Sequence, residues 1–114
     1  MKKAFCILIL SLTIFACKTT EPLYYHGAYN QAVYAYFKAD DTTLEEQISM
    51  LQQTIQAAEN AGKQIAPGIH AHLGLLYFDT GNSDLGQQHF AQEKVLFPES
   101  AQYLDFLLKS RQGA

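Results

Sequence analysis

Residues 67–100, PGIHAHLGLLYFDTGNSDLGQQHFAQEKVLFPES, decide the fold. Gly74 has no side chain, so a partner helix can approach it closely, while Tyr77 and Phe90 are large enough to fill the space between two helices. Gly81 provides a turn, and Pro98 ends a helix because it cannot donate a backbone hydrogen bond. The stretch therefore predicts a helical hairpin.

The same residues fall at the spacings of a tetratricopeptide (TPR) repeat. Counted from Pro67, the seventh and eighth positions are Leu73 and Gly74, the eleventh is Tyr77, and the 34-residue period closes at Ser100. Three positions depart from the pattern, and they are His70, where an aromatic residue is expected, and Gly86 and Glu93, where small residues are expected. In a TPR the first helix of each pair lines the concave surface, which here corresponds to Gly68, Ala71, Leu75, Phe78 and Asp79; the predicted partner-binding groove is Ala71, Leu75, Phe78 and Asp79. The apolar groove residues would be covered either by the tyrosine-rich N-terminal segment of this chain or by a partner protein.

An aromatic segment from Tyr24 to Phe37 is expected to form the first helix. Its rings would pack mainly against the next helix, as the core seam of the first hairpin. The alternative is that Tyr24, Tyr25 and Tyr34 form a rim that contacts another protein, because tyrosine is enriched at interfaces.

The second helix has the clearest pattern in the chain. Thr43 with Glu46, or Thr42 with Glu45, fits a capping box, and Gly62 supplies a C-terminal cap. The predicted buried stripe is Leu44, Ile48, Leu51, Ile55, Ala58 and Ala61, and the predicted solvent face is Gln47, Gln53, Gln56, Glu59 and Asn60.

Three further helices are expected. The third opens at Pro67-Gly68, and its predicted buried stripe is Ile69, Leu73, Leu76 and Tyr77. The fourth runs from Asp84 to about Phe97 with Ser83 as its N-cap. Ser100 caps a fifth helix, in which Leu104, Leu107 and Leu108 cover the end of the stack. The predicted fold of residues 24–112 is thus all-α, with two TPR-like hairpins and a C-terminal capping helix.

The N-terminus has the pattern of a lipoprotein signal peptide over residues 1–16. Lys2 and Lys3 precede an uncharged apolar run that ends in Ile14-Phe15-Ala16-Cys17, which resembles the lipobox of bacterial lipoproteins. In that reading Cys17 is acylated, residues 17–23 are a lipidated tether, and the acyl chains anchor the protein in a membrane. The absence of aspartate after Cys17 resembles lipoproteins sent to the outer membrane, facing the periplasm. An ordinary secreted protein with a free Cys17 is the alternative.

Composition excludes several kinds of site. Loss of Lys2 and Lys3 with the signal changes the net charge from −3 to −5, and without a basic face a nucleic-acid partner is not expected. Cys6 would be removed and Cys17 acylated, which leaves no disulfide. His70 and His72, two residues apart, point to nearly opposite sides of a helix and cannot chelate one metal together. No catalytic residues, metal or cofactor are predicted, although a histidine paired with Asp79 or Glu93 stays geometrically open.

Several segments together resemble a family of small, uncharacterised TPR-like lipoproteins of Gram-negative bacteria. The resemblance rests on Tyr25-His26-Gly27-Ala28-Tyr29, the aromatic residues after it, Pro67-Gly68, and Phe90 through Glu93-Lys94 to Phe97-Pro98-Glu99-Ser100. That family has a tryptophan where His26 stands, and its members are typically encoded beside a lipoprotein similar to CsgG, the curli secretion channel.

The resemblance implies a non-enzymatic adaptor, lipid-anchored in the outer membrane, that assists a secretion or envelope complex. Its expected partners are other envelope proteins, with a CsgG-like lipoprotein as the leading candidate, or a second copy of the chain. A pilotin-like or peptidoglycan-synthesis accessory lipoprotein is the alternative, and a periplasmic hydrolase is a more distant one.

Overall fold

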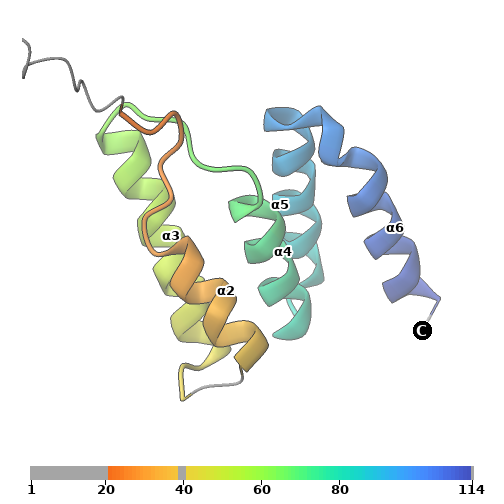
Figure 1. The fold of residues 1–114 in the computed structure, drawn as a ribbon. Coiled ribbons are helices and arrows are strands. Elements are labelled where there is room, and N and C mark those ends of the chain that lie inside the picture. The colour runs from red at the N-terminus through yellow and green to blue at the C-terminus, as the bar shows by residue number, and fades with distance from the viewer. Residues whose placement is uncertain (1–20, 39–40, 114) are drawn as a thin grey trace, which may run out of the picture.

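A computed structural model describes residues 21–38 and 41–113, and over these ranges the fold is all-helical (Figure 1). The helices are α2 (Tyr29–Lys38), α3 (Leu44–Asn60), α4 (Ile69–Asp79), α5 (Ser83–Leu96), the short 3₁₀ helix η2 (Pro98–Ser100) and α6 (Ala101–Gln112). They form two hairpins, α2–α3 and α4–α5, followed by a C-terminal helix. The predicted fold class is confirmed.

The α4–α5 hairpin is closely packed at two glycines. A Cβ atom on Gly74 would lie 2.5 Å from the Phe90 ring, and one on Gly86 would lie 2.9 Å from the Phe78 ring. The Phe78 and Phe90 rings meet edge to face with centroids 5.2 Å apart. Each helix thus presents a glycine to a phenylalanine of the other, as the sequence predicts for Gly74 and Phe90.

The glycines that follow α3 and α4 end these two helices in the same way. Gly62 and Gly81 have positive φ angles of 63° and 85°, which glycine adopts without steric cost. After α3, Lys63 N–H donates to the Ala58 carbonyl at 2.9 Å, and after α4, Asn82 N–H donates to the Tyr77 carbonyl at 2.8 Å. These six-to-one bonds are Schellman motifs.

The first helix begins later than predicted, at Tyr29 rather than Tyr24. Tyr25 instead pairs with the linker before α4: its N–H donates to the Gln64 carbonyl at 2.8 Å, and its carbonyl accepts from Ala66 N–H at 3.0 Å. The Thr54 hydroxyl on α3 then accepts the N–H of Ala28 at 3.1 Å. Long-range hydrogen bonds, which helical periodicity does not predict, hold residues 24–28 as a bridge at Tyr25 followed by a turn, outside the helix.

The capping box that opens α3 is confirmed for the Thr43 and Glu46 pair. The Glu46 carboxylate accepts Thr43 N–H at 2.8 Å, and the Thr43 hydroxyl accepts Glu46 N–H at 3.2 Å. Gln47 was assigned to the solvent face, which is wrong: its side chain is buried and donates to the Thr42 carbonyl at 3.1 Å. Ala61, assigned to the buried stripe, is exposed because it lies past the last turn of α3.

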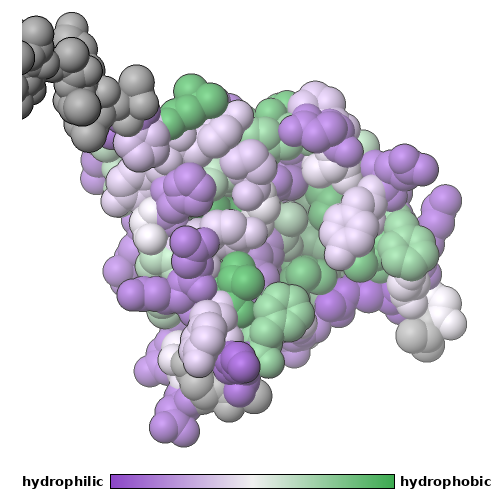
Figure 2. Space-filling view, in the orientation of Figure 1, coloured by the Kyte–Doolittle hydropathy of each residue, from purple (hydrophilic) through white to green (hydrophobic). Residues whose placement is uncertain are grey.

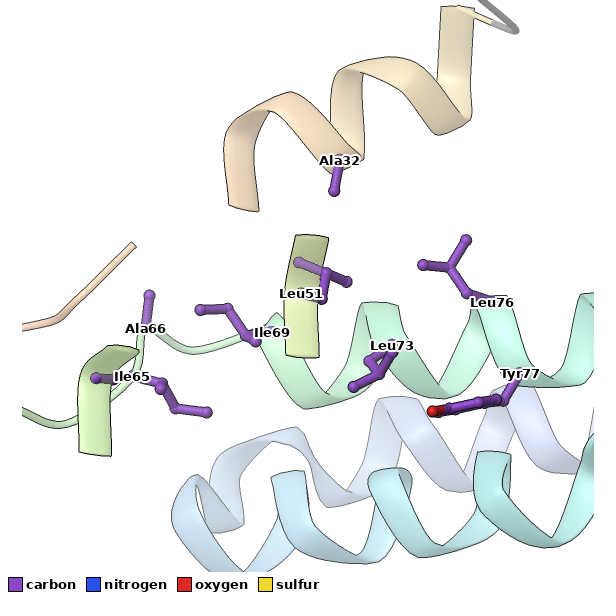
Figure 3. Packing of buried hydrophobic residues seen from close by; sticks show 9 residues of the cluster. Ala32, Leu51, Ile65, Ala66, Ile69, Leu73, Leu76 and Tyr77 are labelled. Atoms are coloured by element: carbon purple, nitrogen blue, oxygen red, sulfur yellow. The ribbon is translucent and has the colours of Figure 1, made fainter. Parts of the chain in front are cut away.

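A single apolar cluster joins the two hairpins (Figure 3). Its buried members are Ala32, Leu51, Ala58, Ile65, Ala66, Ile69, Leu73, Leu76 and Tyr77. The predicted stripe of α4 lies in this cluster in full, so that α4 packs on α2, α3 and α5 at once. A helix surrounded by others in this way is apolar on most sides, as the sequence of α4 is.

The chain leaves α5 at Phe97, one residue earlier than predicted, because the residue before a proline avoids the helical conformation. Ser100 occupies the N-cap position of α6, as predicted, but its hydroxyl does not bond to α6; it donates back to the Phe97 carbonyl at 2.7 Å and closes η2. By contrast, α5 starts at Ser83, with Asn82 rather than Ser83 at the cap position. Leu104 of α6 is buried, as predicted. Across residues 21–38 and 41–113, no helix has both the length and the apolar character of a membrane span.

Candidate functional site

A groove of about 390 Å³ lies between α2 and α6, with α4 as its floor. We call it the α2–α6 groove. Of the helices within residues 21–38 and 41–113, all except α3 contribute to its lining, which is Tyr29, Pro67, Gly68, Ala71, His72, Leu75, Glu93, Phe97, Glu99, Ser100, Tyr103 and Leu104. Figure 2 shows the corresponding hollow, with apolar surface between the two outer helices. The groove is open to solvent and mainly apolar.

At one end of this groove, the Glu93 side chain of α5 binds the backbone at the start of α4. Its carboxylate accepts Gly68 N–H at 2.7 Å and Ala71 N–H at 3.2 Å, so it satisfies the free N–H groups at the start of α4. Gly68 has a φ of 99° and offers no side chain as a cap. Burial raises the pKa of the Glu93 carboxyl, these backbone hydrogen bonds lower it, and the nearby Glu99 raises it further. The departure from the TPR pattern at Glu93 thus has a structural role, which is to cap α4 from the neighbouring helix.

The opposite end of α4 is tied to both outer helices through Asp79. The Tyr36 hydroxyl of α2 donates to Asp79 Oδ2 at 2.7 Å, and Arg111 Nη2 of α6 lies 3.0 Å from Asp79 Oδ1. The Arg111 guanidinium also lies over the Phe78 ring, 5.2 Å from its centroid. Burial and the hydrogen bond to Asp79 raise the pKa of Tyr36. These contacts join α2, α4 and α6 beyond the groove.

Only some of the residues predicted to form a groove line the α2–α6 groove. Ala71 and Leu75 line it, and Leu75 is partly exposed there. Phe78 and Asp79 lie further along α4, where Phe78 packs against Gly86 and Asp79 holds Tyr36 and Arg111.

The three predicted rim tyrosines do not line the groove. Tyr24 packs edge to face on Phe97 with centroids 5.9 Å apart, and Tyr25 pairs with the linker at Ile65. Tyr34 is 60% exposed and lines a separate depression between α2 and α3. The tyrosine-rich segment therefore forms one edge of the groove through Tyr29 and leaves it uncovered.

His70 and His72 face different helices, as their spacing predicts. The His70 and His89 Nδ1 atoms are 2.9 Å apart, a distance that requires one ring to donate to the other. The His89 ring stacks on Tyr77, whose hydroxyl accepts from Gln52 at 2.6 Å. Burial and the neighbouring His89 lower the pKa of His70 to about 4, and burial lowers the pKa of His89. Both rings are therefore neutral at pH 7.

His72 lies between α4 and α2. Its ring meets Tyr36 edge to face with centroids 5.1 Å apart, and it meets Tyr29 at 6.3 Å. Burial lowers the pKa of His72. The residue is nearly as buried as the core aliphatic residues. Within the described ranges, no group of three or more metal-ligating side chains comes together.

Comparison with known proteins identifies a family. A family model described as a domain of unknown function (DUF4810) matches residues 23–107. The chain belongs to this family. The matched span of the DUF4810 domain covers all four helices of the two hairpins and half of α6. No curated protein and no solved structure matches the chain. The family description states neither an activity nor a partner, so the expected association with a CsgG-like protein stays a prediction.

Several residues of the groove were not predicted from the sequence. Tyr103 was not singled out, and Glu99 was noted only as part of the resemblance, although both line the groove of the DUF4810 domain beside Tyr29. Of the groove residues that were missed or misjudged, Glu93 is the one that the sequence marks as unusual, because it is a carboxylate where the repeat pattern has a small residue. Cys17, the predicted lipidation site, and residues 1–16 lie outside the described residues.

Proposed function

We propose that this protein is a non-enzymatic adaptor whose α2–α6 groove binds a segment of another polypeptide. The observation that carries the proposal is the groove itself: Leu75 on its floor and Tyr29 and Tyr103 on opposite walls offer apolar and aromatic surface at a concave site. Tyr103 is 63% exposed although it is aromatic. Concave apolar surface with aromatic walls is typical of sites that receive a peptide or a helix.

The polar groups around the groove favour binding over catalysis. The Glu93 carboxylate is occupied with backbone N–H groups of α4, and Asp79 is occupied with Tyr36 and Arg111. A general acid or base must be free to exchange a proton with a substrate. Here both carboxylates hold helices together.

A lipid on Cys17 would hold the adaptor at the inner face of the outer membrane. This part of the proposal is supported by the lipobox-like end of the signal sequence. In cells, Cys17→Ser should move the protein from the membrane fraction into the soluble periplasmic fraction. Equal membrane recovery of the variant and the wild type would contradict lipid anchoring at this residue.

The partner we propose is a CsgG-like lipoprotein of a secretion or envelope complex. It is supported by the resemblance to lipoproteins encoded beside such proteins, and the groove supplies a surface that could hold one of its segments. The chain would then act as an assembly factor on the periplasmic side of that complex.

Leu75→Asp tests the groove because it places a charge on the groove floor. The matched control is Leu85→Asp, at a partly exposed leucine in the first turn of α5 that does not line the groove. Each tagged variant is purified from detergent extract, its helicity is measured by circular dichroism, and the CsgG-like protein is quantified by immunoblot. Loss with Leu75→Asp but not with Leu85→Asp supports the proposal. Equal recovery with both variants contradicts it.

A further inference from the structure

The α2–α6 groove is acidic at one end. Of its twelve lining residues, two are carboxylates, Glu93 and Glu99, and none is lysine or arginine. The two carboxylates are close enough that Glu99 raises the pKa of Glu93. Among the described residues, the ion pairs present involve Glu21, Asp79 and Asp105, so neither groove carboxylate has a cationic partner within the fold.

Two basic residues of α5 and α6 are already paired with carboxylates outside the groove. Arg111 lies past the groove with Asp79 and Phe78, and Lys94 binds Asp105 at 2.7 Å. No arginine or lysine of the described ranges therefore neutralises the acidic end. An occupant that buried Glu99 without supplying a positive charge would pay a desolvation cost, while a cationic occupant would offset it.

The walls of the groove suit a cationic side chain with an aliphatic stem. Tyr29 on α2 and Tyr103 on α6 lie on opposite sides, and aromatic faces attract lysine and arginine head groups. Leu75, Leu104 and Ala71 supply apolar contact for the stem and for neighbouring aliphatic residues. Carboxylates, aromatic rings and aliphatic side chains thus meet in one concave site.

We propose that the α2–α6 groove selects a polypeptide segment that carries a lysine or arginine beside aliphatic residues, with the cation held at the exposed Glu99 carboxylate. This inference rests on the proposed groove function and specifies the chemistry of its partner. Electrostatic complementarity of this kind contributes more to the choice of partner than to the binding affinity.

The test uses three short fluorescein-labelled peptides with the same leucine positions and with lysine, glutamine or glutamate between them. Binding to the purified chain is followed by fluorescence anisotropy. We expect the lysine–leucine peptide to bind about tenfold more tightly than the glutamine–leucine peptide, and the glutamate–leucine peptide to bind most weakly. The preference for lysine should decrease as ionic strength rises.

Glu99→Gln should reduce the lysine preference to about twofold, since Glu99 is exposed and its loss leaves the fold intact. The control Glu45→Gln changes an exposed carboxylate on α3, outside the groove, and should leave the preference unchanged. Equal binding of the lysine and glutamine peptides, or no effect of Glu99→Gln, overturns the inference. No saturable binding of the lysine–leucine peptide to the wild-type chain overturns it as well.

Leu75→Asp separates this inference from the groove function. If Leu75→Asp abolishes binding while Glu99→Gln changes nothing, the groove binds polypeptide but does not select for a cation. If peptide binds equally to wild type, Leu75→Asp and Glu99→Gln, both the groove function and its cation selectivity are wrong.

Discussion

The two hairpins of this protein are held together by different means. In the α4–α5 hairpin, Gly74 and Gly86 bring the helices together and the buried ring of Phe90 fills the space between them. In the α2–α3 hairpin, α2 is only ten residues long, buries Ala32 and Ala35, and leaves Phe37 75% exposed. There the Thr54 hydroxyl of α3 supplements the small core with a hydrogen bond to the backbone N–H of Ala28. The α4–α5 hairpin, which we call the platform, is therefore the more tightly packed of the two. We infer that the α2–α3 hairpin is attached to it more weakly.

The largest effect should come from removing the central ring of the platform. We expect Phe90→Ala to destabilise the protein by about 4 kcal/mol, because it leaves a cavity beside Gly74. The matched change in the other hairpin, Phe37→Ala, should cost less than about 0.5 kcal/mol because that ring is exposed. Urea denaturation measures both. Similar losses for the two variants would contradict the difference between the hairpins.

A pH effect should also arise in the platform, at His70. Its pKa is about 4 in the folded chain against an ordinary value of 6.5, so the unfolded chain binds the proton more readily. Stability contributed by neutral His70 is present above pH 6.5 and is lost as the pH falls from 6.5 to 4, by up to roughly 3 kcal/mol.

His70→Gln isolates this effect from the raised pKa of Glu93, which acts in the opposite direction. Denaturation at several pH values between 7 and 4 should give a smaller loss of stability for His70→Gln than for wild type. Parallel pH profiles would mean that His70 does not titrate with folding.

In the weaker hairpin, the decisive group is the Thr54 hydroxyl. Thr54→Val keeps the side-chain shape but leaves Ala28 N–H without its acceptor, so we expect a loss of about 1.5 kcal/mol. Thr54→Ser retains the hydroxyl and should restore that hydrogen bond. Hydrogen exchange of the first amides of α2 provides the readout. Unchanged exchange in Thr54→Val would show that α2 is held by packing instead.

A smaller effect than at Thr54 is expected at Arg111, which links α6 to the platform. Its ion pair with Asp79 is partly exposed, with 36% and 26% of the two side chains accessible, so Arg111→Ala should cost no more than about 1 kcal/mol. Amide exchange should increase in α6 and not in α4 or α5. A variant with equal exchange in α6 would show that Leu104 and η2 are sufficient to hold that helix.

The platform could be predicted from the sequence because its determinants are local. Gly81 and Pro98 act within a few residues of themselves, and the apolar spacing of α4 matches its buried side. The capping box of α3 likewise lies within four residues. Such patterns indicate the element type before any tertiary contact is known.

The groove was less predictable because its residues meet only after folding. The course of residues 24–28 depends on hydrogen bonds to residues 54, 64 and 66, and helical periodicity favoured a helix there instead. In the sequence Glu93 is only a departure from the repeat pattern. Its capping role depends on folding, which places the start of α4 beside its carboxylate. Tyr103 and Glu99 join the groove because the chain turns at Pro98 and places η2 and the start of α6 along it. Sequence spacing gave no signal for that turn's direction.

Site-specific photocrosslinking in cells tests most directly whether the α2–α6 groove holds a polypeptide. A photoreactive phenylalanine analogue is placed at Leu75 on the groove floor and, as a control, at Gln53 on the exposed side of α3. We predict a discrete larger product on irradiation from position 75 and none from position 53, with the partner identified by mass spectrometry. No product from position 75, or the same product from both positions, would contradict a binding role for the groove.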